Sequence, residues 1–149
     1  MKLGSIAGAA STSGYETWIM LEHFQWGFAA NTSYSQAGAE VTVREVVVKM
    51  KTEKASPLIV NAGVSRTVLT PVSFKFTTTS KDKVDVYLAY DLTGCIITNY
   101  TIEGSNEGHP IETLSLNFTK ITETYTSRDA KLTGTPTSVT YDVKSAQTS

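Results

Sequence analysis

The longest strand-like run in the chain, Ile111–Ser127, constrains the fold more than any other stretch. It is rich in Thr, Ile, Leu, Phe and Tyr and contains neither Pro nor Gly, a composition that favours a β-strand. The apolar residues Leu114, Leu116 and Phe118 recur at every second position. Because alternate residues of a strand point to the same side, these three are predicted to face the core.

The alternation in this run then changes phase. Ile121 and Tyr125 stand at odd positions, so strict alternation would place them on the opposite face. Either a bulge at Thr119–Lys120 restores the face, or both faces of the strand are buried. A strand of this kind suits a closed barrel, or a sheet that is covered on one side and used on the other.

Two earlier stretches show the same change of phase. Glu16–Gly27 is predicted to be a strand with a bulge at Glu22–His23, and Val41–Lys51 a strand that changes phase at Arg44–Glu45. Strands that each bend midway indicate the strong coiling of a small barrel. Trp26, which precedes a glycine, is expected in the core.

The whole chain predicts an all-β, or β-dominated, fold with one short α-helix. We expect a small closed β-barrel of two sheets, with about eight or nine strands, formed by a single domain over residues 1–149. The helix is expected near residues 56–65, with Ser56 as its cap and Pro57 at its first position. Between the second and third strands, Phe28–Glu40 is predicted to be a long loop, which in a compact domain is usually functional or disordered.

Composition excludes several classes of protein. The formal net charge is −1 and no basic cluster occurs, so nucleic-acid binding is not expected. The single cysteine, Cys95, excludes an internal disulfide and a cysteine metal site, and a buried thiol is the expectation. No stretch has the roughly 18 apolar residues of a membrane helix. The first residues are too broken by Gly and Ser for a signal peptide, so synthesis in the cytoplasm without conventional export signals is expected.

Catalysis is not expected. The two histidines, His23 and His109, show no His-x-His or Glu-x-x-His spacing, so no metal site is predicted. Ser105, Glu107 and His109 could be drawn as a triad, but neighbours in one loop rarely reach the required geometry. No phosphate-binding motif is present either, and no cofactor is expected.

Four stretches taken together resemble a known family. They are Phe24–Gly27, Val41–Pro57, Glu112–Thr126 and Tyr141–Lys144, and they occur in the order that the family has. On these stretches the chain resembles the Hcp family, the haemolysin-coregulated tube proteins of bacterial type VI secretion systems. Glu112–Thr126 carries the most specific part of the match.

The resemblance implies a β-barrel of two sheets with one helix at its side, and homo-hexameric rings with an open lumen. The rings would stack into a tube that a contracting sheath drives out behind a spike, so further rings, spike, sheath or baseplate proteins and effector proteins are the implied partners. The protein would be made in the bacterial cytoplasm, leave through the secretion system, and carry effectors within the lumen. No nucleic acid and no membrane insertion are implied.

The resemblance also assigns roles to single residues. Gln25 alternates with Phe24 and Trp26 and matches a position that faces the lumen and contacts cargo in the family. Ser115 and Asn117 alternate with the core residues of the long strand, and their face is either an ordinary solvent face or a surface of the lumen or subunit contact. Residues of two loops are expected to mediate ring stacking: Asn31, Thr32, Ser33, Tyr34, Ser35, Gln36, Asn106 and Glu107.

A second interpretation stays open at this point. A small β-barrel that binds a ligand or a carbohydrate could share the architecture alone. Such a module usually presents a platform of surface aromatic residues, whereas Tyr15 and Tyr34 are scattered along the sequence.

Overall fold

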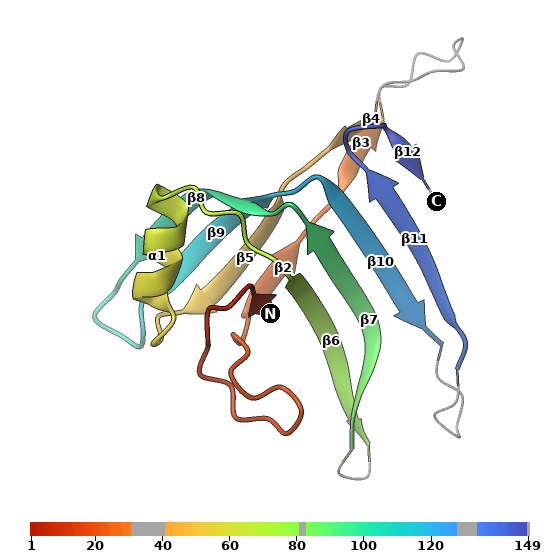
Figure 1. Ribbon diagram of the computed structural model, residues 1–149. Helices are drawn as coiled ribbons and strands as arrows, with labels where there is room; N and C mark the ends of the chain where they lie inside the picture. Colours follow the sequence, from red (N-terminus) through yellow and green to blue (C-terminus); the bar gives the residue numbers. More distant parts are fainter. Residues whose placement is uncertain (31–40, 81–82, 128–133, 149) are drawn as a thin grey trace.

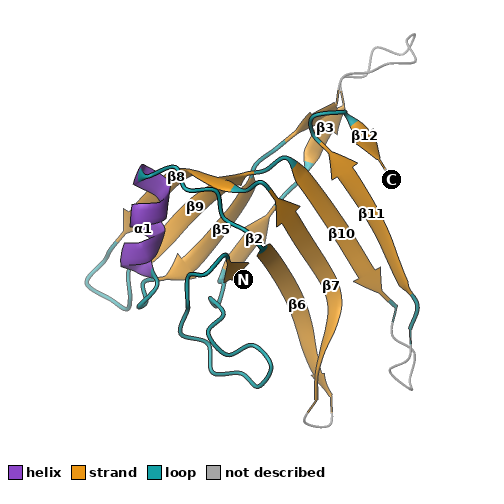
Figure 2. Ribbon diagram, viewed as in Figure 1, coloured by secondary structure: helices purple, strands orange, loops and turns teal. Residues whose placement is uncertain are grey.

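Antiparallel β-structure accounts for nearly all of the regular backbone in the computed structural model, which describes residues 1–30, 41–80, 83–127 and 134–148. The two larger sheets have six strands, in the order β1-β6-β7-β10-β11-β12, and four strands, in the order β2-β5-β9-β8. A small third sheet pairs β3 with β4. Figures 1 and 2 show the two larger sheets crossing, with α1 beside β8.

The strands fall into three groups by sheet. The six-stranded sheet contains β1 (Lys2–Leu3), β6 (Val72–Ser80), β7 (Lys83–Thr93), β10 (Lys120–Thr126), β11 (Pro136–Asp142) and β12 (Gln147–Thr148). The four-stranded sheet contains β2 (His23–Gln25), β5 (Val46–Lys51), β9 (Ile111–Asn117) and β8 (Ile96–Glu103). The third pairs β3 (Phe28–Ala30) with β4 (Val41–Val43), and the helix α1 spans Ser56–Val64.

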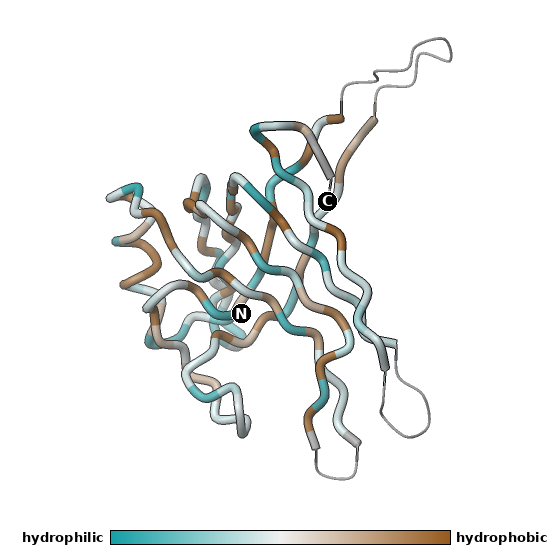
Figure 3. Tube along the Cα trace, turned by 45° about the vertical axis from the view of Figure 1, so that its right-hand side comes forward, coloured by the Kyte–Doolittle hydropathy of each residue, from teal (hydrophilic) through white to brown (hydrophobic). Residues whose placement is uncertain are grey.

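The predicted β-dominated fold of two sheets with one short helix is therefore confirmed. In the described part of the chain, backbone pairing does not join the two larger sheets into one closed barrel. Both sheets instead share a core between them, in which Phe24 of β2 packs against Phe74, Phe76 and Tyr90 with ring centroids 4.9–5.3 Å apart. Figure 3 shows how brown and pale residues alternate along the strands, as expected when one face of each is buried.

The long run that dominates the sequence is divided between the two sheets. It forms β9 and β10, separated at Phe118–Thr119, so one continuous segment turns the corner from one sheet to the other. The interruption restores the core face, because Leu116 is 0% exposed and Ile121 is 2% exposed. The first of the two predicted alternatives is correct, although the break falls about one residue earlier than Thr119–Lys120.

A second corner lies beside the first. The chain leaves β7 at Thr93 and enters β8 at Ile96, and Gly94 makes the turn with φ of +60°. The backbone amide of Thr119 donates to the carbonyl of Thr93 at 2.9 Å, and the hydroxyl of Thr119 donates to the same oxygen at 3.0 Å. These two bonds hold the corners of neighbouring segments together.

Two expectations about the strands need correction. The predicted strand Glu16–Gly27 is mostly irregular, and only His23–Gln25 pairs with β5. The predicted loop Phe28–Glu40 begins as a strand, because Phe28–Ala30 pairs with Val41–Val43. Partners distant in the sequence decide both outcomes, and local composition does not reveal them.

The helix lies where it was expected, but its cap is different. Ala55 occupies the N-cap position without a side-chain hydrogen bond, and Ser56 lies inside the helix. The hydroxyl of Ser56 instead accepts a hydrogen bond from the amide of Glu53 at 3.0 Å. Ile59 and Ala62 turn into the core, at 0% and 7% exposure. No helix in the described residues is long and apolar enough to cross a membrane.

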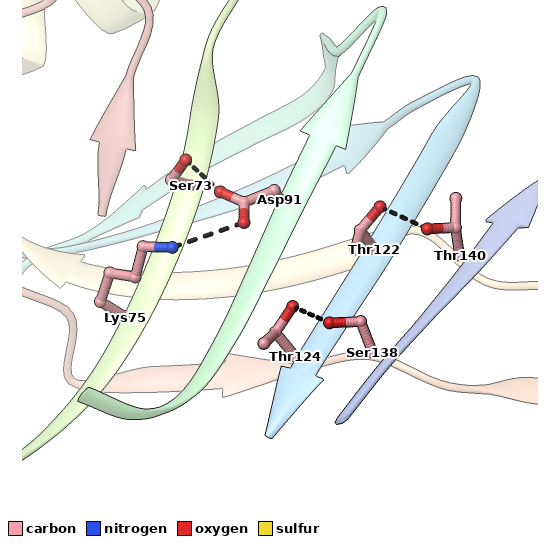
Figure 4. A network of polar contacts seen from close by, with 7 residues as sticks. All are labelled: Ser73, Lys75, Asp91, Thr122, Thr124, Ser138 and Thr140. Atoms are coloured by element: carbon pink, nitrogen blue, oxygen red, sulfur yellow. Dashed lines mark hydrogen bonds and ion pairs between the residues drawn. The ribbon is translucent and has the colours of Figure 1, made fainter. Parts of the chain in front are cut away.

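Hydroxyl groups and charged side chains line the outer face of the six-stranded sheet, and Figure 4 shows seven of these residues. The hydroxyl of Ser73 donates to Asp91, and Lys75 Nζ lies 3.4 Å from the same carboxylate. Across β10 and β11, the hydroxyls of Thr122 and Thr140 lie 2.9 Å apart, as do those of Thr124 and Ser138. This face is polar and internally hydrogen-bonded, so it suits contact with water.

Candidate functional site

The outer face of the four-stranded sheet is the candidate functional site. Along β9, Leu114 and Leu116 are 0% exposed, and Ser115 points to the opposite side between them. The other three strands follow the same alternation, since Phe24, Val48 and Leu114 stand in register and turn to the core. The four strands therefore present one continuous second face outward.

Residues of this outer face line up in rows across the sheet. One row runs from Gln25 on β2 through Val47 and Ser115 to Asn99 on β8. The next row contains His23, Lys49, Thr113 and Thr101 in the same order of strands. We call these two rows, together with Asn117 at the end of β9, the polar face.

The polar face carries short polar side chains at most positions. Asn117 Nδ2 donates to Glu45 Oε1 at 3.5 Å, and the hydroxyl of Thr98 donates to the carbonyl of Ser115 at 3.2 Å. A hollow of about 380 Å³ opens beside Gln25, lined by Trp26, Gly27, Val47 and residues 42–45. Amide and hydroxyl groups of this kind bind water readily and offer little apolar area to another molecule.

The residues predicted for the lumen come together in the structure. Gln25 and Ser115 share a row, two strands apart, and Asn117 stands two positions further along β9 than Ser115. Asn99 also belongs to the face, although it was not among the residues predicted for the lumen. A shift of register between Ile97 and Asn99 reverses the phase of β8, so Ile97 is 7% exposed and Asn99 turns outward.

The other predicted residues have different positions. Phe118 lies in the core and is 5% exposed, and Trp26 is half-buried and packs against the core. Asn106 and Glu107 lie exposed in the turn between β8 and β9, where the hydroxyl of Ser105 donates to the carbonyl of Glu107 at 2.8 Å. Outside the described residues lie Asn31, Thr32, Ser33, Tyr34, Ser35 and Gln36.

One acidic residue sits behind the polar face. Glu112 is 0% exposed on the core side of β9, in register with Met50 and Ile102. Burial, and then the charge of Glu112, raises the pKa of the Tyr100 hydroxyl on the neighbouring strand. Both carboxylate oxygens of Glu112 are buried without a hydrogen-bond partner in the described part of the chain.

The site offers no arrangement that suggests catalysis. His23 is on the polar face and His109 in an exposed turn, on different elements. Over the ranges that the structure describes, no three or more His, Cys, Asp or Glu side chains gather where they could hold a metal ion. What the polar face offers instead is a broad, wettable surface fixed on a rigid sheet.

These features define a class of protein: a β-rich structural protein whose candidate site is a broad sheet face rather than a pocket. A family model described as "Type VI secretion system effector, Hcp" matches residues 1–125. The chain belongs to the Hcp family and is a tube protein of a type VI secretion system. Hcp is a structural protein and not an enzyme, it takes part in the assembly of the secretion system, and it is secreted by that system.

Solved structures show the same fold. A type VI secretion system effector from Yersinia pestis is 24% identical, with a TM-score of 0.78, over 95% of this chain and 97% of its own. Hcp1 from Salmonella typhimurium is 20% identical, with a TM-score of 0.82, over 99% and 95%. The secreted protein Hcp3 from Pseudomonas aeruginosa is 24% identical, with a TM-score of 0.64, over 91% and 85%. No curated protein matches the chain.

Proposed function

We propose that six copies of this chain form a ring in which the polar face lines the lumen, and that such rings stack into the inner tube of the secretion system. The single observation that carries this proposal is the pair of polar rows, Gln25 to Asn99 and His23 to Thr101, across all four strands. A conduit needs a surface that stays wet and releases what it carries. Short amide and hydroxyl groups meet this need.

Effector proteins are the proposed cargo of the lumen. Gln25 stands at the β2 edge of the polar face beside the hollow, where a side chain of a passing protein would find an amide that can both donate and accept. Contacts of this type are individually weak. We therefore assign Gln25, Ser115 and Asn117 to cargo contact.

Stacking of the rings is assigned to two loops. Asn106 and Glu107 lie in the exposed turn at one end of the four-stranded sheet. Residues 31–36 join them in the proposal, although they fall outside the described residues. Because both segments are small and polar, ring-to-ring contact would bury little apolar area and would be reversible. Spike, sheath and baseplate proteins are the further proposed partners, and the cytoplasm is the proposed site of synthesis.

The first experiment is a measurement of mass and shape. Light scattering on the purified protein should give about six times the 16.1 kDa of one chain, and negative-stain electron microscopy should show open rings. A monomer over a wide range of concentrations would contradict the ring proposal. It would leave the fold and the family membership untouched.

A deletion tests the assignment of the stacking loop. Removal of residues 31–37 should leave rings intact and abolish tubes, seen as separate rings at protein concentrations at which the full-length chain stacks. Loss of the ring itself in the deletion variant would refute this assignment.

A further inference from the structure

An uncharged helix surface stands exposed at one end of the molecule. None of the nine residues of α1, Ser56–Val64, is charged. Leu58, Val60 and Val64 are 52%, 38% and 76% exposed, although Ile59 on the other side of the helix is fully buried. A helix that faces water ordinarily carries charged residues on its outer side. Val60 and Val64 stand one turn apart on the outer side of the helix, and Leu58 lies about 160° around the helix axis from Val60. We call these three residues the helix surface, and this surface is suited to contact another apolar surface.

A second apolar surface is exposed on the six-stranded sheet. Ile121, Glu123 and Tyr125 share one face of β10, and Ile121 is 2% exposed in the core. Further along the same face Tyr125 is 51% exposed, and Val139 on β11 is 48% exposed. We call Tyr125 and Val139 the strand surface. The strand surface belongs to the same face of the sheet as the core residue Ile121. At Tyr125 and Val139, however, no other element covers this face, so the side chains are exposed.

The two surfaces lie far apart in the molecule. Figure 1 shows α1 and β8 at one end, on the left, and β10 and β11 extending at the other end, on the right. The helix projects beyond the six-stranded sheet at its end, and the strands extend beyond the four-stranded sheet at theirs. At the end with α1, the six-stranded sheet does not continue, and at the end with β10 and β11, the four-stranded sheet does not continue.

Among the described residues, the charged side chain that stands in register with the strand surface is that of Glu123. It pairs with Val139 on β11 and with Tyr90 on β7. Glu123 accepts a hydrogen bond from the hydroxyl of Tyr90. Because the helix surface brings no charge of its own, the contact avoids the large cost of an unpaired buried ion.

We propose that the helix surface of one copy packs against the strand surface of the next copy, and that this contact joins subunits around the ring. The inference rests on the proposed ring. A closed ring of identical subunits uses two different surfaces at each junction, so every copy must carry both. We assign a second copy of this chain to the strand surface because the other end of that copy carries α1. That end supplies both an apolar surface and an element that can cover the exposed strands.

The test uses charge substitutions on the two surfaces. Val64→Lys and Val139→Glu should each shift the light-scattering mass from a ring toward the 16.1 kDa of one chain. Both side chains are exposed, so the thermal unfolding temperature of Val64→Lys should stay close to that of the parent protein. That of Val139→Glu should fall only slightly, because the new carboxylate lies opposite Glu123 at an exposed position. The double variant Val64→Lys/Val139→Glu places opposite charges at every junction and should restore rings, most strongly at low salt.

A matched control and a cross-link complete the experiment. Met20→Lys changes a residue that is 64% exposed in the irregular segment before β2 and should leave rings intact. The pair Val64→Cys/Val139→Cys should form disulfides between copies under oxidation, seen as a ladder up to the ring, whereas either single substitution should not.

Two failures are distinguishable. If the parent protein forms rings and both Val64→Lys and Val139→Glu also form them, the proposed contact is wrong and the ring proposal stands. If the parent protein forms no rings at all, the ring proposal itself fails, and the inference fails with it.

Discussion

Gly94 lies directly against Thr119, at the point where two neighbouring segments pass from one sheet to the other. Its φ is +60°, and a Cβ atom at this position would come within 2.6 Å of the Thr119 hydroxyl oxygen. Both the backbone conformation and the space therefore require glycine. The two corners of the fold depend on this contact.

Replacement of Gly94 by alanine should destabilise the protein. The left-handed backbone alone costs about 1 kcal/mol or more for a residue with a Cβ, and displacement of the Thr119 side chain adds to this. Urea unfolding should show a lower midpoint with an unchanged slope. Gly14→Ala is the matched control, since Gly14 has φ of +82° but no atom within 4 Å of the added Cβ. Equal losses in the two variants would show that the contact with Thr119 contributes nothing.

The two faces of β9 should respond very differently to substitution. Leu116→Ala removes a side chain that is 0% exposed, and should cost about 2–5 kcal/mol of unfolding free energy. Leu116→Asp should prevent folding, because it buries an unpaired charge. Ser115→Ala, one residue away on the polar face, should stay within about 0.5 kcal/mol of the parent protein. Denaturant unfolding monitored by circular dichroism measures all three.

The thiol of Cys95 should report on unfolding. Cys95 is 0% exposed, and burial raises the pKa of its thiol to about 12. Since the thiolate is the reactive form, a disulfide reagent at about pH 8 should not label the folded protein and should label it completely in denaturant. Rapid labelling of the folded protein would mean that the corner next to Gly94 opens readily.

Stability should fall in alkaline solution as Tyr90 ionises. Burial, followed by the charge of Glu123 and a hydrogen bond to it, raises the pKa of Tyr90 to about 12 from 10.0. Because the folded state holds this proton more tightly, the associated stabilisation is fully present below about pH 10 and is lost as the pH rises toward about 12. Tyr90→Phe should show a smaller loss over that interval, measured as thermal unfolding temperature against pH.

The same residue permits a spectroscopic check. Absorbance at the tyrosinate band should show a late step, at about pH 12, that is lost in Tyr90→Phe. In Glu123→Gln this late step should move to lower pH yet stay above 10.0, because burial is the larger cause of the raised pKa. An unmoved step would exclude Glu123 as a contributor.

Gln25→Arg tests the polar face directly. The side chain is exposed on a sheet face, so rings should form and the fold should stay intact. Six added charges around the lumen should weaken the binding of effectors, measured by co-purification and by secretion from cells. Thr140→Arg, on the hydroxyl face of the other sheet, is the control and should leave both unchanged. Unaltered effector binding and secretion in Gln25→Arg would refute the role of Gln25.

Much of the fold could be predicted from alternation alone. The change of phase at Arg44–Glu45 corresponds to the break between β4 and β5, and the run Ile111–Ser127 does turn a corner near its middle. These signals are local, because alternate residues of a strand point to opposite faces and the buried face carries the apolar residues. The first part of the predicted second strand, Glu16–Glu22, was not predictable in this way. There the backbone bonds to the first residues of the chain, since the amide of Thr17 donates to the carbonyl of Ala10 and the amide of Ile19 donates to the carbonyl of Met1.

The candidate site could be predicted only in part from the sequence. Gln25 and Ser115 follow from alternation in their own strands, whereas their presence in one row depends on the pairing of β2, β5 and β9. Asn99 was not singled out as a site residue, because only the pairing of β8 with β9 shows that it lies beside Ser115. The helix surface was not predicted either, because only the structure shows that Leu58 and Val64 face outward.

The corner at Phe118–Thr119 also has a mechanical consequence. Force applied along β9 reaches β10 through the covalent backbone, without passing through hydrogen bonds that could shear. The neighbouring turn at Gly94 gives β7 and β8 the same continuity. Compression of one sheet is therefore transmitted to the other through two covalent connections, β9 to β10 and β7 to β8, which makes the subunit stiff along these segments.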